Sequence, residues 1–131
     1  MNKNKILDNI IVEDFFYLNI NAINKELLEI VREADHEVTQ ILKKHSLYDK
    51  ISQTIVALIG TKTVGVKGDG RVYGYSLIVR TVETSDFMTA KGFYLTSEVC
   101  EEIISVLTKH PQIVRIFFDW TTKPPATTEF E

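Results

Sequence analysis

The sequence predicts an α+β domain in which two helices cover one face of an antiparallel sheet. Two segments carry apolar residues at helical spacing, two β-rich runs flank an Asp-Gly turn, and a further β-rich run follows the second helical segment. The predicted order is α-β-β-α-β-β, preceded by an amphipathic segment. Helices and hairpin strands in this order pack as a two-layer α/β sandwich.

Residues 1–23 precede the predicted domain, which we place at 24–131. Apolar residues recur every three or four positions in the first segment, at Leu7, Ile11, Phe15 and Leu18. This spacing predicts an amphipathic helix that packs on its own domain or on a partner. Acidic residues interrupt the apolar run, which argues against a signal peptide, and no stretch approaches the length of a membrane span.

The first helix of the domain is predicted from about residue 25 to 45. Its apolar stripe consists of Leu27, Val31, Ala34, Val38 and Ile41. Strands are predicted at about 51–66 and 71–82, because Asp-Gly between two β-rich runs is a strong hairpin signal. Gly60 is expected to mark a bend or bulge in the first strand.

A second helix is predicted from about 96 to 109, capped by Thr96 or Ser97 and ended before Pro111. "IVRIFFDW" is then predicted to be a strand, "TTKPP" a turn and "ATTEF" a short extended segment. The strands carry more apolar side chains than one helix layer covers: Ile55, Ala57, Ile59, Tyr73, Tyr75, Phe117 and Trp120. We therefore expect a subunit interface, and hence a homodimer, on the free face of the sheet. Arg71, which follows the tight turn, is a candidate to reach across that interface.

Composition excludes several classes of function. The net charge is −3, so a nucleic-acid partner is disfavoured. Cys100 is the single cysteine, which rules out an internal disulfide and fits a reducing cytoplasm. It lies mid-helix without a nearby histidine, and the three histidines are too scattered for a metal site. We therefore predict no catalytic and no metal-binding residue. In the loop 82–90, Phe87 and Met88 are expected to fill the core or to contact a partner.

The carboxyl-terminal stretch "KPPATTEFE" is the best candidate for a binding site. Lys123 supplies a cation beside two prolines, whose φ angle is fixed. Thr127 and Thr128 offer hydroxyls, and Glu129 offers acceptors. This set suits a nucleotide monophosphate. The alternative is a terminal edge strand with a solvated lysine.

Four stretches carry a family resemblance: "YDKISQ", "TVGVKGDGRVYGY", "VRTVETSDFMTA" and "DWTTKPPATTEFE". They closely resemble the C-terminal dimerisation domain of glutamine-hydrolysing GMP synthases, over about Glu26 to Glu131. The resemblance implies a domain that pairs two synthetase subunits and completes the site for xanthosine monophosphate (XMP), for amination to GMP in purine biosynthesis. The substrate-binding positions that it implies are Gln53, Lys123, Thr127, Glu129 and Arg115, to which the hydroxyl chemistry of the tail adds Thr128.

The resemblance also implies partners and limits. In the family, ATP and Mg²⁺ are used by an ATP-pyrophosphatase domain with an S-G-G-x-D-S loop, which this sequence lacks. The chain alone is therefore expected to bind no cofactor and to be inactive without that domain or subunit. Thr128 replaces the usual isoleucine, and residues 1–23 have no match. A pure dimerisation module that has lost nucleotide binding stays open as the alternative.

Overall fold

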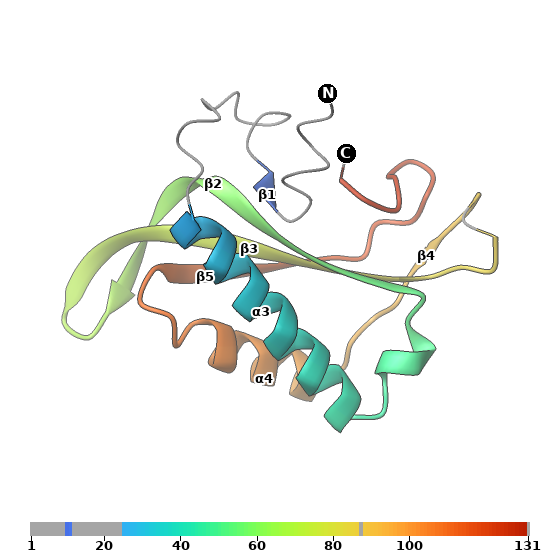
Figure 1. The fold of residues 1–131 in the computed structure, drawn as a ribbon, viewed down its shortest axis with the longest axis horizontal. Helices are drawn as coiled ribbons and strands as arrows, with labels where there is room; N and C mark the ends of the chain where they lie inside the picture. Colours follow the sequence, from blue (N-terminus) through green and yellow to red (C-terminus); the bar gives the residue numbers. More distant parts are fainter. Residues whose placement is uncertain (1–9, 12–24, 87, 131) are drawn as a thin grey trace.

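The computed structural model describes residues 10–11, 25–86 and 88–130. The described elements are β1 (Ile10–Ile11), α3 (Lys25–Lys44), the 3₁₀ helix η2 (Tyr48–Lys50), β2 (Gln53–Lys67), β3 (Gly70–Glu83), β4 (Lys91–Gly92), α4 (Ser97–Leu107) and β5 (Ile113–Asp119). The two α-helices lie side by side on one face of the sheet, and the carboxyl-terminal segment lies on the other side (Figure 1). The predicted α+β class is confirmed.

The helices form as the apolar spacing predicts. All five residues of the predicted stripe on α3 are buried, and α4 buries Val99, Ile103 and Leu107. The Thr96 hydroxyl caps α4 by accepting a hydrogen bond from the Val99 amide at 3.4 Å. Both helices pack on alternate residues of the hairpin: Val56, Leu58, Leu77 and Val79. This packing makes the helix layer and the inner face of the sheet one hydrophobic core.

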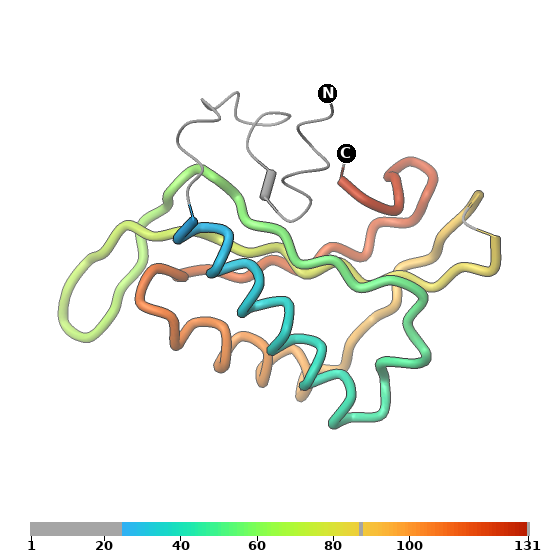
Figure 2. The backbone as a smooth tube through the Cα atoms, in the orientation of Figure 1, coloured from blue at the N-terminus to red at the C-terminus, as the bar shows by residue number. Residues whose placement is uncertain are grey.

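The long β2–β3 hairpin forms the centre of the sheet. Its antiparallel register runs from Gln53 opposite Val82 to Lys67 opposite Gly70. The turn contains Gly68 with a φ of 62°, a conformation that glycine adopts without steric cost. The register shifts between Ile59 and Thr63, around the predicted bend. Beyond this shift the hairpin extends past the helices as an arm, residues 63–74 (Figure 2).

β5 runs parallel to β3, from Ile113 beside Tyr75 to Asp119 beside Arg80. The chain leaves β3, crosses back through α4 and re-enters the sheet at the same end, so both strands point the same way. β1 also pairs parallel, with β2. The sheet is therefore mixed, whereas the sequence led us to expect antiparallel strands throughout.

The last predicted strand, over "ATTEF", does not form. Lys123 makes an isolated antiparallel bridge with Ala90, and turns and bends follow it. The two prolines have no amide N–H for a ladder, and both of their preceding peptide bonds are cis. The Ala126 amide donates back to the Thr122 carbonyl at 3.0 Å, which closes a turn instead of extending a strand.

The helix predicted in residues 1–23 lies outside the described residues, apart from Ile10 and Ile11. These two residues form strand β1 and pair with Leu58 and Ile59 of β2. At these two positions the chain is a strand and not the predicted helix. The reason is that the edge of β2 supplies backbone hydrogen-bond partners, which the local sequence pattern does not reveal.

The apolar strand residues divide between two faces. Tyr75 and Trp120 pack against the helix-side core, and Tyr73 is exposed on the arm. We call the opposite face, which carries Ile55, Ala57, Ile59, Ser76, Ile78, Arg80, Arg115, Phe117 and Asp119, the outer face. On it Phe117 remains 46% exposed. The outer face therefore combines buried and exposed apolar residues.

Candidate functional site

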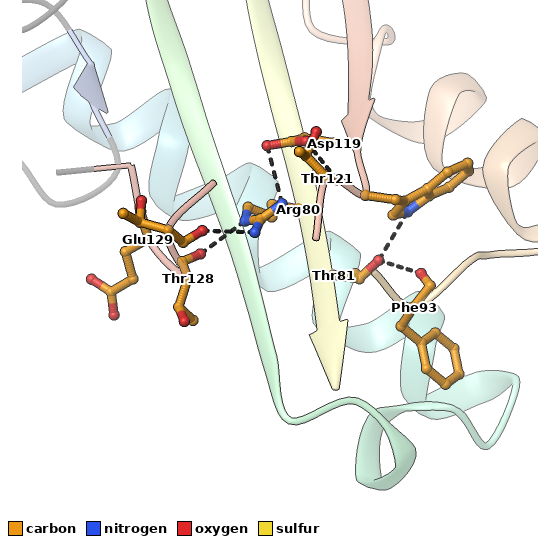
Figure 3. Close-up of polar contacts among 9 residues, drawn as sticks. Arg80, Thr81, Phe93, Asp119, Thr121, Thr128 and Glu129 are labelled. Carbon is orange, nitrogen blue, oxygen red and sulfur yellow. Dashed lines mark hydrogen bonds and ion pairs between the residues drawn. The ribbon is translucent and has the colours of Figure 1, made fainter. Parts of the chain in front are cut away.

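The candidate site lies on the outer face, at the end of the sheet where β2 begins and where β3 and β5 end. Strand alternation places Gln53, Arg80 and Asp119 on this face. The carboxyl-terminal segment 120–130, which we call the tail, leaves β5 at the same end and folds back over them (Figure 3). Residues from three strands and from the tail therefore converge there.

The guanidinium of Arg80 lies at the centre of this site. Its Nε donates to the Thr128 carbonyl at 2.9 Å, and Nη2 donates to the Thr127 carbonyl at 2.7 Å. Nη1 lies 3.2 Å from Oδ2 of Asp119. The arginine side chain is 0% exposed, and Figure 3 shows it between Asp119 on one side and the tail on the other. A buried guanidinium remains charged, so the neighbouring carboxylate and the two carbonyls stabilise it.

Two of the predicted binding residues bond directly to each other. The Gln53 side-chain amide donates to Oε2 of Glu129 at 2.6 Å, across 76 positions of sequence. The Thr127 hydroxyl donates to the Glu129 backbone carbonyl. Thr128 is buried, and its hydroxyl oxygen has no hydrogen-bond partner among the described residues. The structure thus brings these four predicted positions together.

Lys123 is held to the body of the domain by its backbone. Its amide donates to the Ala90 carbonyl at 2.8 Å, and the Ala90 amide donates back at 3.1 Å. Beside this bridge lies an open cleft of about 600 Å³. The cleft is lined by Ser52, Glu83, Thr84, Ser85, Thr89, Ala90, Lys91 and Thr122. Five of these residues carry a hydroxyl group. Two of them, Ser52 and Thr122, directly precede Gln53 and Lys123 in the chain, so the cleft adjoins these two predicted positions.

Arg115 and Arg71 lie away from the tail. The Arg115 guanidinium donates to the Val64 carbonyl of the arm at 3.1 Å, four residues before the end of β5. Arg71 pairs with Val66 near the tip of the arm. Thirteen residues of strand separate Val66 from Gln53, which corresponds to about 40 Å. Within one chain, therefore, Arg71 does not reach the site.

Sequence reasoning missed Arg80 and Asp119 as parts of the site. A signal for Arg80 was present, because a lone arginine follows the apolar run "SLIV" inside a strand. Arginine is almost never fully buried unless it is paired, so an arginine that follows an apolar run inside a strand indicates a specific partner. The partners themselves, two tail carbonyls and a carboxylate of β5, depend on the fold.

Other chemistry is sparse in the part of the chain that the structure describes. No group of three or more histidine, cysteine or acidic residues there is placed to hold a metal ion. None of the described helices is both long and apolar enough to span a membrane. Cys100 packs against the core, and burial, assisted by Glu101, raises the pKa of its thiol. A raised pKa disfavours the reactive thiolate, in agreement with a structural role.

Comparison with known proteins identifies the family. The sequence profile of the GMP synthase C-terminal domain matches residues 40–130. The chain is 42% identical over 113 residues to the glutamine-hydrolysing GMP synthases of Plasmodium falciparum and Thermus thermophilus, and 39% identical to that of Eremothecium gossypii. These alignments cover 86% of this chain and 20–22% of the relatives, so the chain spans about a fifth of their length. The chain belongs to the family of GMP synthase C-terminal domains.

Proposed function

We propose that this chain is the dimerisation and XMP-binding part of a GMP synthase, the ligase that converts XMP to GMP with ATP and glutamine. The observation that carries the proposal is the convergence of Gln53, Thr127, Thr128 and Glu129 at one end of the sheet, beside the cleft next to Lys123. The names of the relatives support the reaction class.

The chemistry of the converging groups suits a purine mononucleotide. The ammonium of Lys123 would face the phosphate, since a charge-assisted bond to phosphate is among the stronger polar contacts. Glu129 would accept a hydrogen bond from a ribose hydroxyl. The contact with Glu129 uses one of the two N–H groups of the Gln53 amide, so this amide can serve the carboxylate and a ligand at the same time.

One half of the nucleotide site would come from outside this chain. We propose that an ATP-pyrophosphatase domain or subunit faces the tail and the cleft, and that it supplies the groups that hold ATP and Mg²⁺. Met88, in the loop beside the cleft, is 77% exposed rather than packed into the core, while Phe87 lies outside the described residues. An exposed methionine at this position favours the partner-contact interpretation of the loop.

The outer face would form the homodimer interface. Phe117 is exposed there, and β5 pairs with β3 on one side only among the described strands. The arm carries exposed Val66, Arg71 and Tyr73 beyond the helices. Tyrosine and arginine are enriched among residues that dominate binding energy, and Arg71 would act on the second subunit because it cannot reach its own tail.

The test is an assay of the chain mixed with a separately produced ATP-pyrophosphatase part of a GMP synthase. We expect GMP formation in the mixture and none with the chain alone. Lys123→Ala should raise the KM for XMP about tenfold to a hundredfold, because a hydrogen bond to a charged group contributes about 1.5–3 kcal/mol. Lys109→Ala, in the turn that follows α4, is the matched control and should leave this KM unchanged.

Two results would contradict the proposal. An unchanged KM in Lys123→Ala would remove this lysine from the site. If the mixture makes no GMP and the chain shows no response to millimolar XMP in NMR spectra while it still dimerises, the alternative of a dimerisation module without a nucleotide site holds instead.

A further inference from the structure

Arg80 carries a charge that is fully buried, and the proposed nucleotide chemistry does not use it. The side chain is 0% exposed; Nε and Nη2 each donate to a tail carbonyl at 2.9 and 2.7 Å, and Nη1 forms an ion pair of 3.2 Å with Asp119 that does not have hydrogen-bond geometry. Burying an unpaired guanidinium would be costly, so these partners must be present whenever the domain is folded with this side chain inside. The arrangement leaves the guanidinium committed to the protein rather than to a ligand.

Two of these three partners are backbone carbonyls of the tail, at Thr127 and Thr128. A bond to a backbone carbonyl fixes the path of the chain, whatever side chain the residue carries. The side chains of Thr127, Thr128 and Glu129 project from this short stretch, so their positions follow from the position of its backbone. The planar guanidinium suits this task because its donors form a rigid fork.

The third partner links the beginning of the tail to the same group. Asp119 ends β5; its Oδ2 lies 3.2 Å from Arg80 Nη1, and its Oδ1 accepts a hydrogen bond from the Thr121 amide at 3.0 Å (Figure 3). The Asp119 carboxylate therefore stabilises the turn at the beginning of the tail. It also neutralises the Arg80 guanidinium, which binds the carbonyls near the end of the tail.

We propose that Arg80 is the positioning residue of the carboxyl-terminal binding site, with Asp119 as its counter-charge. This inference rests on the proposed function for the identity of the ligand, XMP. Arg80 acts through the tail backbone: it presents the exposed side chains of Thr127 and Glu129 to the ligand and does not touch the phosphate itself. Losing it should loosen the tail and weaken XMP binding while the helix–sheet core stays folded.

The experiment compares Arg80→Lys with Lys123→Ala in the 131-residue chain. Amide hydrogen exchange is measured on the chain itself, and XMP is titrated in the presence of the ATP-pyrophosphatase part of a GMP synthase. A lysine keeps the charge but cannot hold two carbonyls and a carboxylate in the fork geometry. We expect the Ala126 amide to exchange at least about tenfold faster in Arg80→Lys, with core amides of β2 and β3 unchanged, and XMP affinity to fall about tenfold. Lys123→Ala should lose XMP affinity and keep the protection of Ala126.

Unchanged protection of Ala126 in Arg80→Lys would overturn the proposal, as would an equal loss of protection throughout the domain. If protection is lost in the tail alone but XMP does not bind even to the wild-type chain mixed with the ATP-pyrophosphatase part, the positioning role stands and the proposed ligand is wrong.

A thermodynamic cycle covers the case in which Arg80→Lys does not fold. Thermal unfolding is measured for chains that end after Ala126, in the wild-type and Arg80→Met backgrounds. Truncation should lower the Tm of the wild-type background by more than that of the Arg80→Met background, because only the wild type loses partners of a buried charge. Equal decreases would mean that Arg80 and the tail are not coupled and would refute the proposal.

Discussion

Glu102 shows how a single carboxylate connects the two helices. Its Oε1 lies 2.7 Å from Nε2 of His45, and its Oε2 accepts a hydrogen bond from Lys44 Nζ at 2.9 Å. Both partners lie at the carboxyl end of α3, where cations are favoured by the helix dipole. The hydrogen bond with His45, followed by that from Lys44, lowers the pKa of Glu102 below its ordinary value of 4.5. The contact therefore favours the ionised carboxylate.

This shift predicts an acid-sensitive contribution to stability. A carboxyl group with a lowered pKa in the folded protein stabilises it above the ordinary pKa, and this contribution is lost as the pH falls through the lowered value. Glu102→Gln should therefore have a lower Tm than the wild type at pH 7, and the difference should shrink as the pH falls below the ordinary pKa and the carboxylate becomes protonated. Thermal unfolding of both proteins at intervals from pH 7 to pH 3 measures this difference in Tm.

The exposed neighbour Glu101 provides the matched control for this pH series. Glu101→Gln, one residue away on the same helix, should show no comparable gap that closes with acid. A Tm difference between Glu102→Gln and the wild type that stays constant with pH would mean that the ionised contact contributes nothing to stability.

At the scale of the elements, the arm of the hairpin is hydrogen-bonded to the segment that connects the end of α4 to the beginning of β5. Nζ of Lys67, at the end of β2, donates to the carbonyls of Thr108 and His110 at 2.6 and 2.9 Å. This cation caps the carboxyl end of α4. The Tyr75 amide donates to the Gln112 carbonyl at 2.7 Å, which joins β3 to the loop before β5. The arm therefore contacts the packed domain through Lys67 near its tip and beside Tyr75 at its base.

Close packing at the base of the arm makes Gly74 sensitive to any side chain. A Cβ at Gly74 would lie 2.7 Å from both the Gln112 carbonyl oxygen and Cγ1 of Val114, whereas a Cβ at Gly70 of the same strand would meet nothing within 4 Å. Gly74→Ala should lower the free energy of unfolding by about 2–3 kcal/mol. Gly70→Ala should change it by less than about 0.5 kcal/mol. Urea denaturation of both variants measures this, and equal effects would contradict the packing of the arm on β5.

At the scale of the whole molecule, the two faces of the sheet have different roles. The inner face is filled by the helices, and the outer face holds the tail at one end and Phe117 further along β5. The proposed dimer and the proposed nucleotide site thus share one face. Any interface on the outer face lies close to the tail, so assembly and ligand binding can be coupled.

The dimer proposal predicts that a charge on the outer face weakens self-association. Phe117→Glu should shift the dimer dissociation constant at least about tenfold, because it places an unpaired carboxylate in an apolar contact. Ile104→Glu, on α4, is the matched control, since Ile104 is 40% exposed and Phe117 46%. Sedimentation velocity over a concentration series measures the association. A chain that is monomeric throughout, or equal behaviour of the two variants, would argue against this interface.

Much of the fold could be predicted because its signals are local. Both helices, the hairpin and β5 lie within a few residues of their predicted bounds. The tail failed as a strand because Pro124 and Pro125 remove the N–H groups that a ladder requires, and this outweighed the β-propensity of the threonines. Of the predicted binding positions, Gln53 and Glu129 meet in the structure, whereas Arg115 turns to the arm.

The amino-acid sequence by itself determined the order of the elements, the buried stripe of each helix and the family of the chain, because periodicity, turn chemistry and motifs are read from residues close together. Only the tertiary structure decided that β5 lies parallel to β3, that Asp119 therefore stands beside Arg80, and that the tail folds back onto both. The physical reason is that strand direction and register are set by packing between distant segments. The partners of a buried charge such as that of Arg80 come from these distant segments, so the sequence alone does not identify them.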